Sequence, residues 1–169
     1  PTAKRQIVIH HTAGSTKSPS RTISSWSKRT DHVATHYITN NLGDKEQLFA
    51  DEAWANHLGI KRSQFKQFGV AWQNLNKTSL GIEMQAFGGL KKKDGKYFTY
   101  VNSEIDASRV AVPVDKNGNP TTYKGYSYYE KYNAANIQSV KEIVQGWMSK
   151  YGIPFVYDYD VLFPASPVK

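Results

Sequence analysis

The sequence contains no cysteine. This absence excludes disulfide bonds, thiol nucleophiles and cysteine-ligated zinc, and it leaves any metal to histidine, aspartate and glutamate. Long apolar runs are also absent, since no stretch approaches the ~20 residues that a membrane-spanning helix needs. The serine-nucleophile pattern G-x-S-x-G, the glycine patterns of nucleotide-binding loops and H-E-x-x-H do not occur. A catalytic site, if present, must therefore be assembled from scattered side chains.

The chain is basic and of single-domain size. Its 169 residues suffice for one domain with a sizeable core. The formal net charge of +8 predicts attraction to polyanions, of which nucleic acid and an anionic bacterial cell wall or membrane surface are candidates. We interpret residues 1–169 as one domain.

The most informative stretch is an apolar strand that ends in two histidines. Ile7 to Ile9 is β-branched throughout, which predicts a strand buried on both faces in the middle of a sheet. His10 and His11 follow directly. Because successive strand residues point to opposite faces, one imidazole faces a cleft while the other packs or hydrogen-bonds behind it. A structural role and a metal-ligand role both remain open for the pair.

Hydrophobic periodicity and turn residues predict the other elements. They are an amphipathic helix over 20–29, a hairpin over 33–49, a strand over 79–86, a helix from Asn133 or Asn136 to Gly152, and a short strand over 155–161. In the helix, Ile137, Val140, Ile143, Val144, Trp147 and Met148 form one apolar stripe. In the strand over 79–86, Glu83 faces opposite to the apolar set.

Two segments interrupt this pattern. Residues 51–68 are polar and irregular, and we interpret them as a site-lining connection that carries Trp54 and His57. Residues from about 88 to 132 hold two turn signals and a tyrosine-dense end, which indicates an inserted β-excursion. We expect most of these tyrosines to pack in the core, with ligand contact as the alternative.

Polar residues at the ends of three predicted strands form the candidate site. His10, His36 and Glu83 lie at such ends, and His57 comes from the polar connection. This set suits metal-assisted hydrolysis, in which zinc lowers the pKa of a bound water and a carboxylate takes the proton. Purely structural roles for the same residues are the alternative.

Four motifs occur in a characteristic order. They are Ile7–Thr12, Ala34–Ile38, Ala53–Gly59 and Ser79–Glu83. With them the chain resembles the N-acetylmuramoyl-L-alanine amidase type 2 family, which includes bacterial and phage cell-wall amidases and is similar to peptidoglycan recognition proteins. The resemblance implies a single α/β domain with a central mixed sheet flanked by helices and a zinc ion at the strand ends. It further implies cleavage of the amide between N-acetylmuramic acid and L-alanine of peptidoglycan.

The resemblance also implies roles for individual residues. His10 matches the first zinc ligand. Glu83 matches the acidic catalytic residue, which would orient or deprotonate the zinc-bound water. Trp54 and His57 match a cleft-lining pair that contacts substrate or stabilises the developing oxyanion. His36 matches a position beside the cleft, with support of a neighbouring group as its alternative role.

The sequence departs from the family at its C-terminal end. The family takes two more zinc ligands from the segment after the last helix, but this chain has no histidine after His57. Either the chain ends at Lys169 before those ligands, or Asp158 replaces one of them. The proline-rich end favours the first explanation. His10 alone would hold zinc poorly, because catalytic zinc usually has three protein ligands.

Three functions follow as hypotheses. The first is a zinc-dependent peptidoglycan amidase acting outside the cell or at the cell wall, as an autolysin or as a phage-encoded endolysin on the host wall. The second is a catalytically impaired peptidoglycan-binding module of the same fold. The third is a basic structural or nucleic-acid-binding phage component. The third explains the charge but leaves Glu83, Trp54 and His57 without a role, so we expect peptidoglycan and anionic cell-wall polymers as partners instead of nucleic acid.

Overall fold

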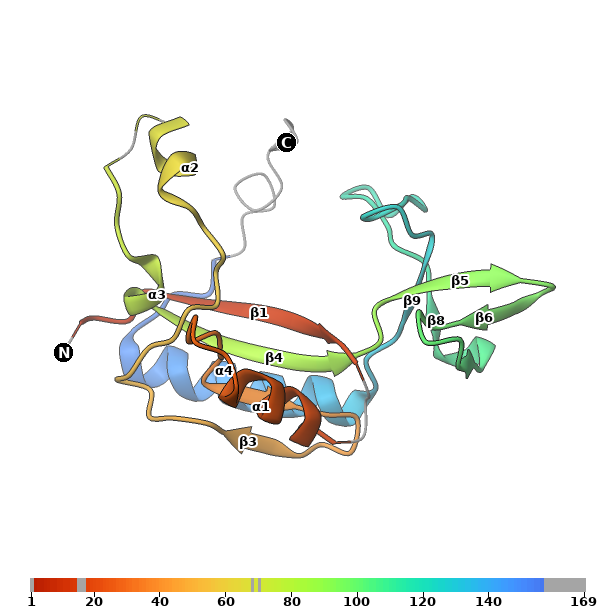
Figure 1. Cartoon of the computed structure of the whole chain (residues 1–169), viewed down its shortest axis with the longest axis horizontal. Helices are drawn as coiled ribbons and strands as arrows, with labels where there is room; N and C mark the ends of the chain where they lie inside the picture. The colour runs from red at the N-terminus through yellow and green to blue at the C-terminus, as the bar shows by residue number, and fades with distance from the viewer. Residues whose placement is uncertain (1, 15–17, 68, 70, 157–169) are drawn as a thin grey trace.

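A four-stranded mixed sheet forms the body of the computed structural model, which describes residues 2–14, 18–67, 69 and 71–156 (Figure 1). The strand order is β1-β4-β2-β3, with bounds Gln6–Ala13, Ser79–Ala86, Tyr37–Thr39 and Lys45–Gln47. Strands β1 and β2 run parallel to β4, and β3 runs antiparallel to β2. The sheet lies between α4 (Ala134–Tyr151) and α1 (Ser20–Ser27), which confirms the α/β class predicted from the sequence.

The core lies between β4 and α4. Leu80 and Ile82 are fully buried and pack against Val140, Ile143 and Trp147. Burial of each large apolar side chain contributes about 1.5–3 kcal/mol. The opposite face of β4 carries Glu83, as the alternation predicts.

Helix α4 begins and ends as its sequence predicts. Asn133 is the N-cap, and its side-chain oxygen accepts a hydrogen bond of 2.9 Å from the backbone N–H of Asn136. Gly152 ends the helix in the left-handed region with φ of +64°. The predicted stripe is wrong at Ile137, which is 52% exposed because it faces a cavity beside the first turn of the helix.

The predicted position of the first strand is wrong. Among the described residues β1 pairs with β4 alone, and Ile9 is 51% exposed. The strand buried on both faces is β4. Seven of its eight residues are buried, and Glu83 is the exception. A β-branched run favours a strand, but it does not decide which strand takes the centre of the sheet.

The segments around the hairpin follow the sequence only in part. Helix α1 and the β2–β3 hairpin are present, but the hairpin strands are short because Val33 bridges to Asn56 instead of joining β2. Residues 51–68 were predicted to be irregular, and this prediction is wrong over α2 (Arg62–Gln67). The start of α2 is stabilised by a 2.7 Å hydrogen bond that Gln64 Oε1 accepts from the N–H of Lys61. A further short helix, α3, covers Leu75–Thr78.

A second sheet forms the predicted β-excursion and extends away from the main sheet (Figure 1). Its order is β7-β6-β5-β9-β8. The strands are β5 (Gly89–Lys93), β6 (Lys96–Phe98), β7 (Glu104–Ile105), β8 (Val110–Ala111) and β9 (Tyr128–Glu130), with a 3-10 turn η1 over Ala107–Arg109. Buried Glu130 joins the two sheets, because its carboxylate binds Arg109 and accepts a 2.8 Å hydrogen bond from the N–H of Phe87.

The end of the chain lies mostly outside the described residues. Phe155 and Val156 are exposed and form no strand, and the rest of the strand predicted over 155–161, Asp158 included, falls in the undescribed part. Over the ranges that the structure covers, no helix is both long and apolar enough to cross a membrane.

Candidate active site

Glu83 lies at the centre of the candidate site. It is the register partner of His10 in the parallel β1–β4 pair, so both side chains project from the sheet face opposite α4. Burial raises the pKa of Glu83 to about 7. A carboxyl group that titrates near neutral pH can both accept and donate a proton.

The Glu83 side chain lines a groove with a volume of about 670 Å³. The groove is bounded by the end of β1, by α1 and by the second sheet, which contribute His11, Trp26 and Tyr100 to its walls. The Tyr100 hydroxyl donates a 2.8 Å hydrogen bond to the carbonyl of Ala13 and so holds the second sheet against the end of β1. The volume of the groove lies within the range typical of small-molecule sites.

His10 is the first member of a chain of hydrogen bonds. Its Nε2 lies 2.9 Å from Nδ1 of His57, and Nε2 of His57 lies 2.7 Å from the Ser79 hydroxyl. Burial lowers the pKa of His10, with a smaller contribution from His11. Burial also lowers the pKa of His57 to about 3, with smaller contributions from His10, His36 and Lys4. Burial therefore favours the neutral form of both imidazoles.

The loop that carries His57 is fixed by α3. The side-chain oxygen of Asn76 accepts hydrogen bonds from the backbone N–H groups of His57 and Leu58, at 3.0 and 3.1 Å. Gly81 leaves room for the ring, because a Cβ at that position would lie 3.0 Å from Nδ1 of His57. With both ring nitrogens bound inside the chain, His57 is arranged to orient His10.

His36 is fully buried beneath this pair. Its Nδ1 accepts a 3.1 Å hydrogen bond from the N–H of Gly81, and its Nε2 lies 3.2 Å from the carbonyl of Ala53. Its ring packs against Phe49 and Trp147. This environment favours the supporting role that the sequence left as the alternative to substrate contact.

Trp54 and His11 take places that the sequence did not predict. Trp54 is 44% exposed and lines a neighbouring cavity between α1 and the loop after β3, where Lys77 Nζ lies 5.3 Å from its ring centre. Trp26 lines both that cavity and the Glu83 groove. His11, expected to point away, lines the Glu83 groove and a second cavity on its other side.

Sequence reasoning missed Gln85. It stands two residues after Glu83, on the same face of β4, and is 1% exposed in the wall of the groove. Its Nε2 donates a 2.8 Å hydrogen bond to the carbonyl of Ser18. The period-2 pattern that placed Glu83 also places Gln85, so the signal was available.

The described residues alone do not fit a three-ligand zinc site. No group of three histidine, aspartate or glutamate side chains among them is arranged to hold a metal. Nε2 of His10 lies at hydrogen-bond distance from Nδ1 of His57, so these two nitrogens already engage each other. Further ligands would have to come from outside the described residues, where Asp158 lies.

A carboxyl group of pKa near 7 that lines a groove and shares a sheet face with a hydrogen-bonded imidazole is an arrangement suited to acid–base hydrolysis. The family model for N-acetylmuramoyl-L-alanine amidase matches residues 1–162. The chain therefore belongs to this amidase family.

A solved amidase structure shows the same fold. The chain is similar to the N-acetylmuramyl-L-alanine amidase AmiD from E. coli, in complex with anhydro-N-acetylmuramic acid-L-Ala-D-γ-Glu-L-Lys. The identity is 19%, the match covers 91% of this chain and 46% of that one, and the TM-score is 0.54. AmpDh3 from Pseudomonas aeruginosa, alone and in complex with anhydromuramic pentapeptide, matches at 18% identity over 90% of this chain and 48% of that one, with a TM-score of 0.49. The chain thus spans about half the length of these proteins. A comparison with curated protein sequences found no match.

Proposed function

We propose that this chain hydrolyses the amide bond between N-acetylmuramic acid and L-alanine in peptidoglycan. The observation that carries the proposal is the position of Glu83, which lies half-buried in the groove with a pKa of about 7. Family membership supplies the bond that is cleaved. The AmiD structure supports this choice, because that enzyme binds a muropeptide.

Glu83 would carry the proton through the reaction. Its carboxylate accepts a proton from water as the water oxygen bonds to the muramoyl carbonyl carbon. The protonated Glu83 then donates that proton to the alanine nitrogen as the carbon–nitrogen bond breaks. A pKa near 7 suits both steps, because the group gains and loses the proton at similar cost.

Zinc is the cofactor that family membership implies. When bound in enzymes of this kind, zinc polarises the carbonyl and lowers the pKa of water. His10 is the described residue at a family ligand position, and Asp158 is the sequence's candidate for a second. Zinc content of the purified chain, compared between wild type, His10→Ala and Asp158→Ala, tests this part of the proposal. Loss of zinc in both variants supports it, and unchanged zinc content in either removes that residue from the ligand set.

A peptidoglycan-binding module without catalysis is the second candidate. The observation that favours it is that the metal-ligating side chains among the described residues do not complete a metal site. Such a module would bind cell walls through the same groove and leave the amide intact. Purified cell walls separate the two functions, because an amidase frees L-alanine amino termini from them and a binding module only pellets with them.

We also propose the bacterial cell wall as the place of action, either from outside the producing cell or as a phage-encoded protein acting on its host. The charge of +8 supports attraction to anionic cell-wall polymers. Binding to purified walls should then weaken as salt is raised. Salt-independent binding would overturn the electrostatic part of this proposal.

A further inference from the structure

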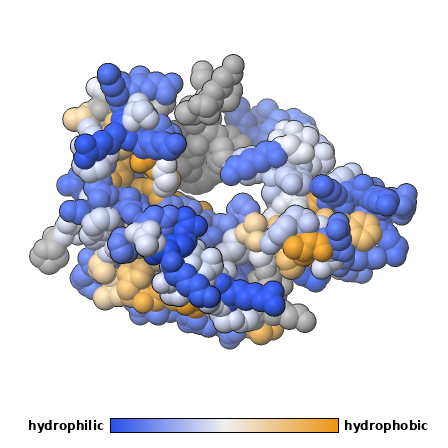
Figure 2. All heavy atoms as spheres, viewed as in Figure 1, coloured by the Kyte–Doolittle hydropathy of each residue, from blue (hydrophilic) through white to orange (hydrophobic). Residues whose placement is uncertain are grey.

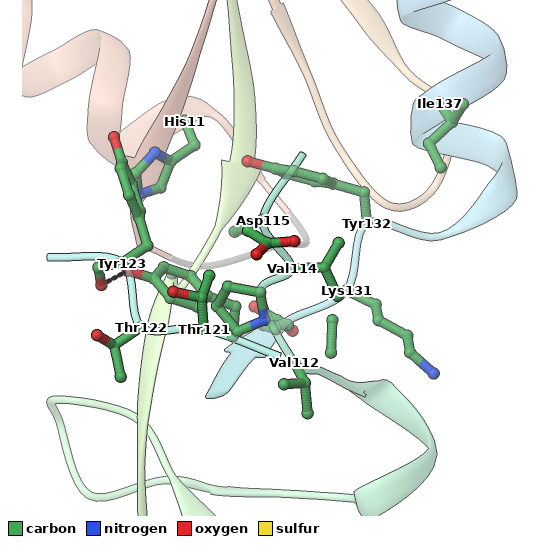
Figure 3. Close-up of a pocket in the computed structure, with 16 residues that line it drawn as sticks. His11, Val112, Val114, Asp115, Thr121, Thr122, Tyr123, Lys131, Tyr132 and Ile137 are labelled. Carbon is green, nitrogen blue, oxygen red and sulfur yellow. Dashed lines mark hydrogen bonds between the residues drawn. The ribbon is translucent and has the colours of Figure 1, made fainter. Parts of the chain in front are cut away.

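A second cavity, of about 740 Å³, lies between the main sheet and the β-excursion (Figure 3). Its walls come from the segment between β8 and β9, from the end of β9 and from the first turn of α4. We call it the tyrosine cleft, and its lining residues that matter here are Val112, Val114, Tyr123, Tyr129, Tyr132 and Ile137. Figure 2 shows the molecule hollowed between the body and the lobe that the second sheet forms.

The tyrosine cleft adjoins the Glu83 groove. His11 is common to the lining of both cavities, so the two spaces lie on either side of one side chain. In Figure 3, Tyr132 extends from its backbone toward the His11 side of the cleft. A substrate held at Glu83 therefore has a second hollow within reach of one of its branches.

The lining combines apolar surface with hydroxyl groups. Val112, Val114 and Ile137 are 46%, 54% and 52% exposed, and Tyr123 is 42% exposed. Large apolar side chains gathered around one concavity mark a binding surface. Tyrosine rings add flat faces with a polar end, and Thr121 and Thr122 add further hydroxyls.

Contacts within the chain order this tyrosine segment before any ligand arrives. The Tyr129 hydroxyl donates a 2.5 Å hydrogen bond to the carbonyl of Tyr123. Backbone hydrogen bonds of 3.0 Å in both directions join Tyr123 and Tyr126. The Tyr126 ring covers Gly89 so closely that a Cβ there would lie 2.4 Å from it. A segment that is already ordered loses less conformational entropy on binding.

The charged groups of the cleft are already engaged. Lys131 Nζ donates a 3.1 Å hydrogen bond to the carbonyl of Ser108, and the Glu130 carboxylate binds Arg109. Asp115 Oδ1 accepts hydrogen bonds from the N–H groups of Asn117 and Asn119. Among the described residues Lys131 is the one lysine in this lining, so the cleft offers little to the several carboxylates of a stem peptide, whereas its apolar and hydroxyl surface matches a neutral ligand.

We propose that the tyrosine cleft binds an N-acetylated hexosamine unit of the glycan strand. Such a sugar presents C–H faces that stack on aromatic rings, an acetamido methyl that fits the valine and isoleucine surface, and hydroxyls that pair with tyrosine and threonine. The proposal rests on the proposed function, because the amide cleaved at Glu83 joins a sugar to a peptide. The cleft holds the sugar side of that bond.

Titration calorimetry with chitotetraose, a neutral N-acetylglucosamine oligomer without a peptide, tests the proposal. Wild type should bind it, and Tyr123→Ala and Ile137→Ser should each weaken binding by about fivefold to tenfold, because one aromatic or apolar contact is lost. Tyr128→Ala is the matched control. The Tyr128 side chain projects from the face of β9 opposite to Tyr129, and its ring centre lies 5.1 Å from that of Tyr97. Chitotetraose binding should therefore stay unchanged in Tyr128→Ala.

The outcomes separate this proposal from the amidase proposal. Chitotetraose binding that persists in Glu83→Gln supports the cleft whether or not the wild type cleaves peptidoglycan. Absence of chitotetraose binding in a wild type that cleaves peptidoglycan overturns the cleft alone. Equal binding by wild type and both cleft variants, each with an unchanged melting temperature, or displacement of chitotetraose by the free peptide L-Ala-D-γ-Glu-L-Lys, also overturns it.

Discussion

His10 and Glu83 stand opposite each other on neighbouring parallel strands and share one face of the main sheet. The next residue on β4, Met84, faces the core, whereas His11 on β1 lines both the Glu83 groove and the tyrosine cleft. This register places the His10 and Glu83 side chains on one sheet face, where Glu83 lines the groove, and it sends the apolar side chains of β4 to the core. The position of the site follows from this pairing.

Removing the proton carrier should abolish most turnover. Glu83→Gln keeps the shape of the side chain but cannot accept a proton, so we expect the rate of amide cleavage to fall by about 100-fold or more. Binding of muropeptide should persist. Glu46→Gln, on exposed β3, is the matched control and should leave the rate unchanged. A Glu83→Gln rate within a factor of two of wild type would remove Glu83 from the reaction.

The raised pKa of Glu83 should appear in two pH profiles. Activity should rise as pH increases through about 7, because the ionised carboxylate begins the reaction. Stability should change in the opposite sense. The unfolded chain loses the Glu83 proton near 4.5 and the folded chain near 7, so this group lowers the free energy of unfolding as pH rises through that window. Chemical denaturation from pH 4.5 to 7.5 should show a contribution of this sign that Glu83→Gln removes, and identical profiles for both proteins would contradict it.

Two glycine substitutions should act in opposite directions. Gly81→Ala places a methyl group 3.0 Å from the His57 ring and 3.1 Å from Cγ2 of Thr35, so we expect lower stability and a displaced His57. Gly146→Ala places a methyl group in open space on α4 and should stabilise the chain by about 0.5–1 kcal/mol, since alanine favours helix. Urea unfolding measures both. A Gly81→Ala protein as stable and as active as wild type would show that the His57 position is not restricted.

The link between the two sheets should depend on Arg109. Arg109→Ala leaves the buried carboxylate of Glu130 with the N–H of Phe87 as its described partner, and we expect the free energy of unfolding to fall by about 2 kcal/mol. Lys96→Ala removes an exposed ion pair with Glu104 in the same sheet and should change stability by less than about 0.5–1 kcal/mol. Equal losses in the two variants would mean that the Glu130 pair is no stronger than a surface pair.

Local sequence patterns predicted which segments form helices and strands better than they predicted how deeply those segments are buried. Alternation placed Leu80 and Ile82 inward and Glu83 outward, and the caps placed both ends of α4. Burial depends on which elements pack together, so the run Ile7 to Ile9 did not show that β1 pairs with β4 alone among the described residues. Ile137 was misplaced for the same reason, because the cavity it faces is formed by a distant insertion.

Motifs marked His10, His57 and Glu83 as candidates, and their roles stay predictions. The structure adds the hydrogen bond between the two imidazoles. Tyr100 was not predictable as a wall of the groove, since its bond to Ala13 joins residues 87 positions apart. The tyrosine cleft was beyond sequence reasoning too, because its walls meet only after both sheets have formed.

Mass spectrometry of a defined muropeptide tests the central claim most directly. Anhydro-N-acetylmuramic acid-L-Ala-D-γ-Glu-L-Lys is incubated with wild type and with Glu83→Gln, each with added zinc. We predict that wild type converts it to the free sugar acid and the tripeptide L-Ala-D-γ-Glu-L-Lys, and that Glu83→Gln leaves it intact. An intact muropeptide after incubation with folded, muropeptide-binding wild type would contradict the amidase account and favour the binding module.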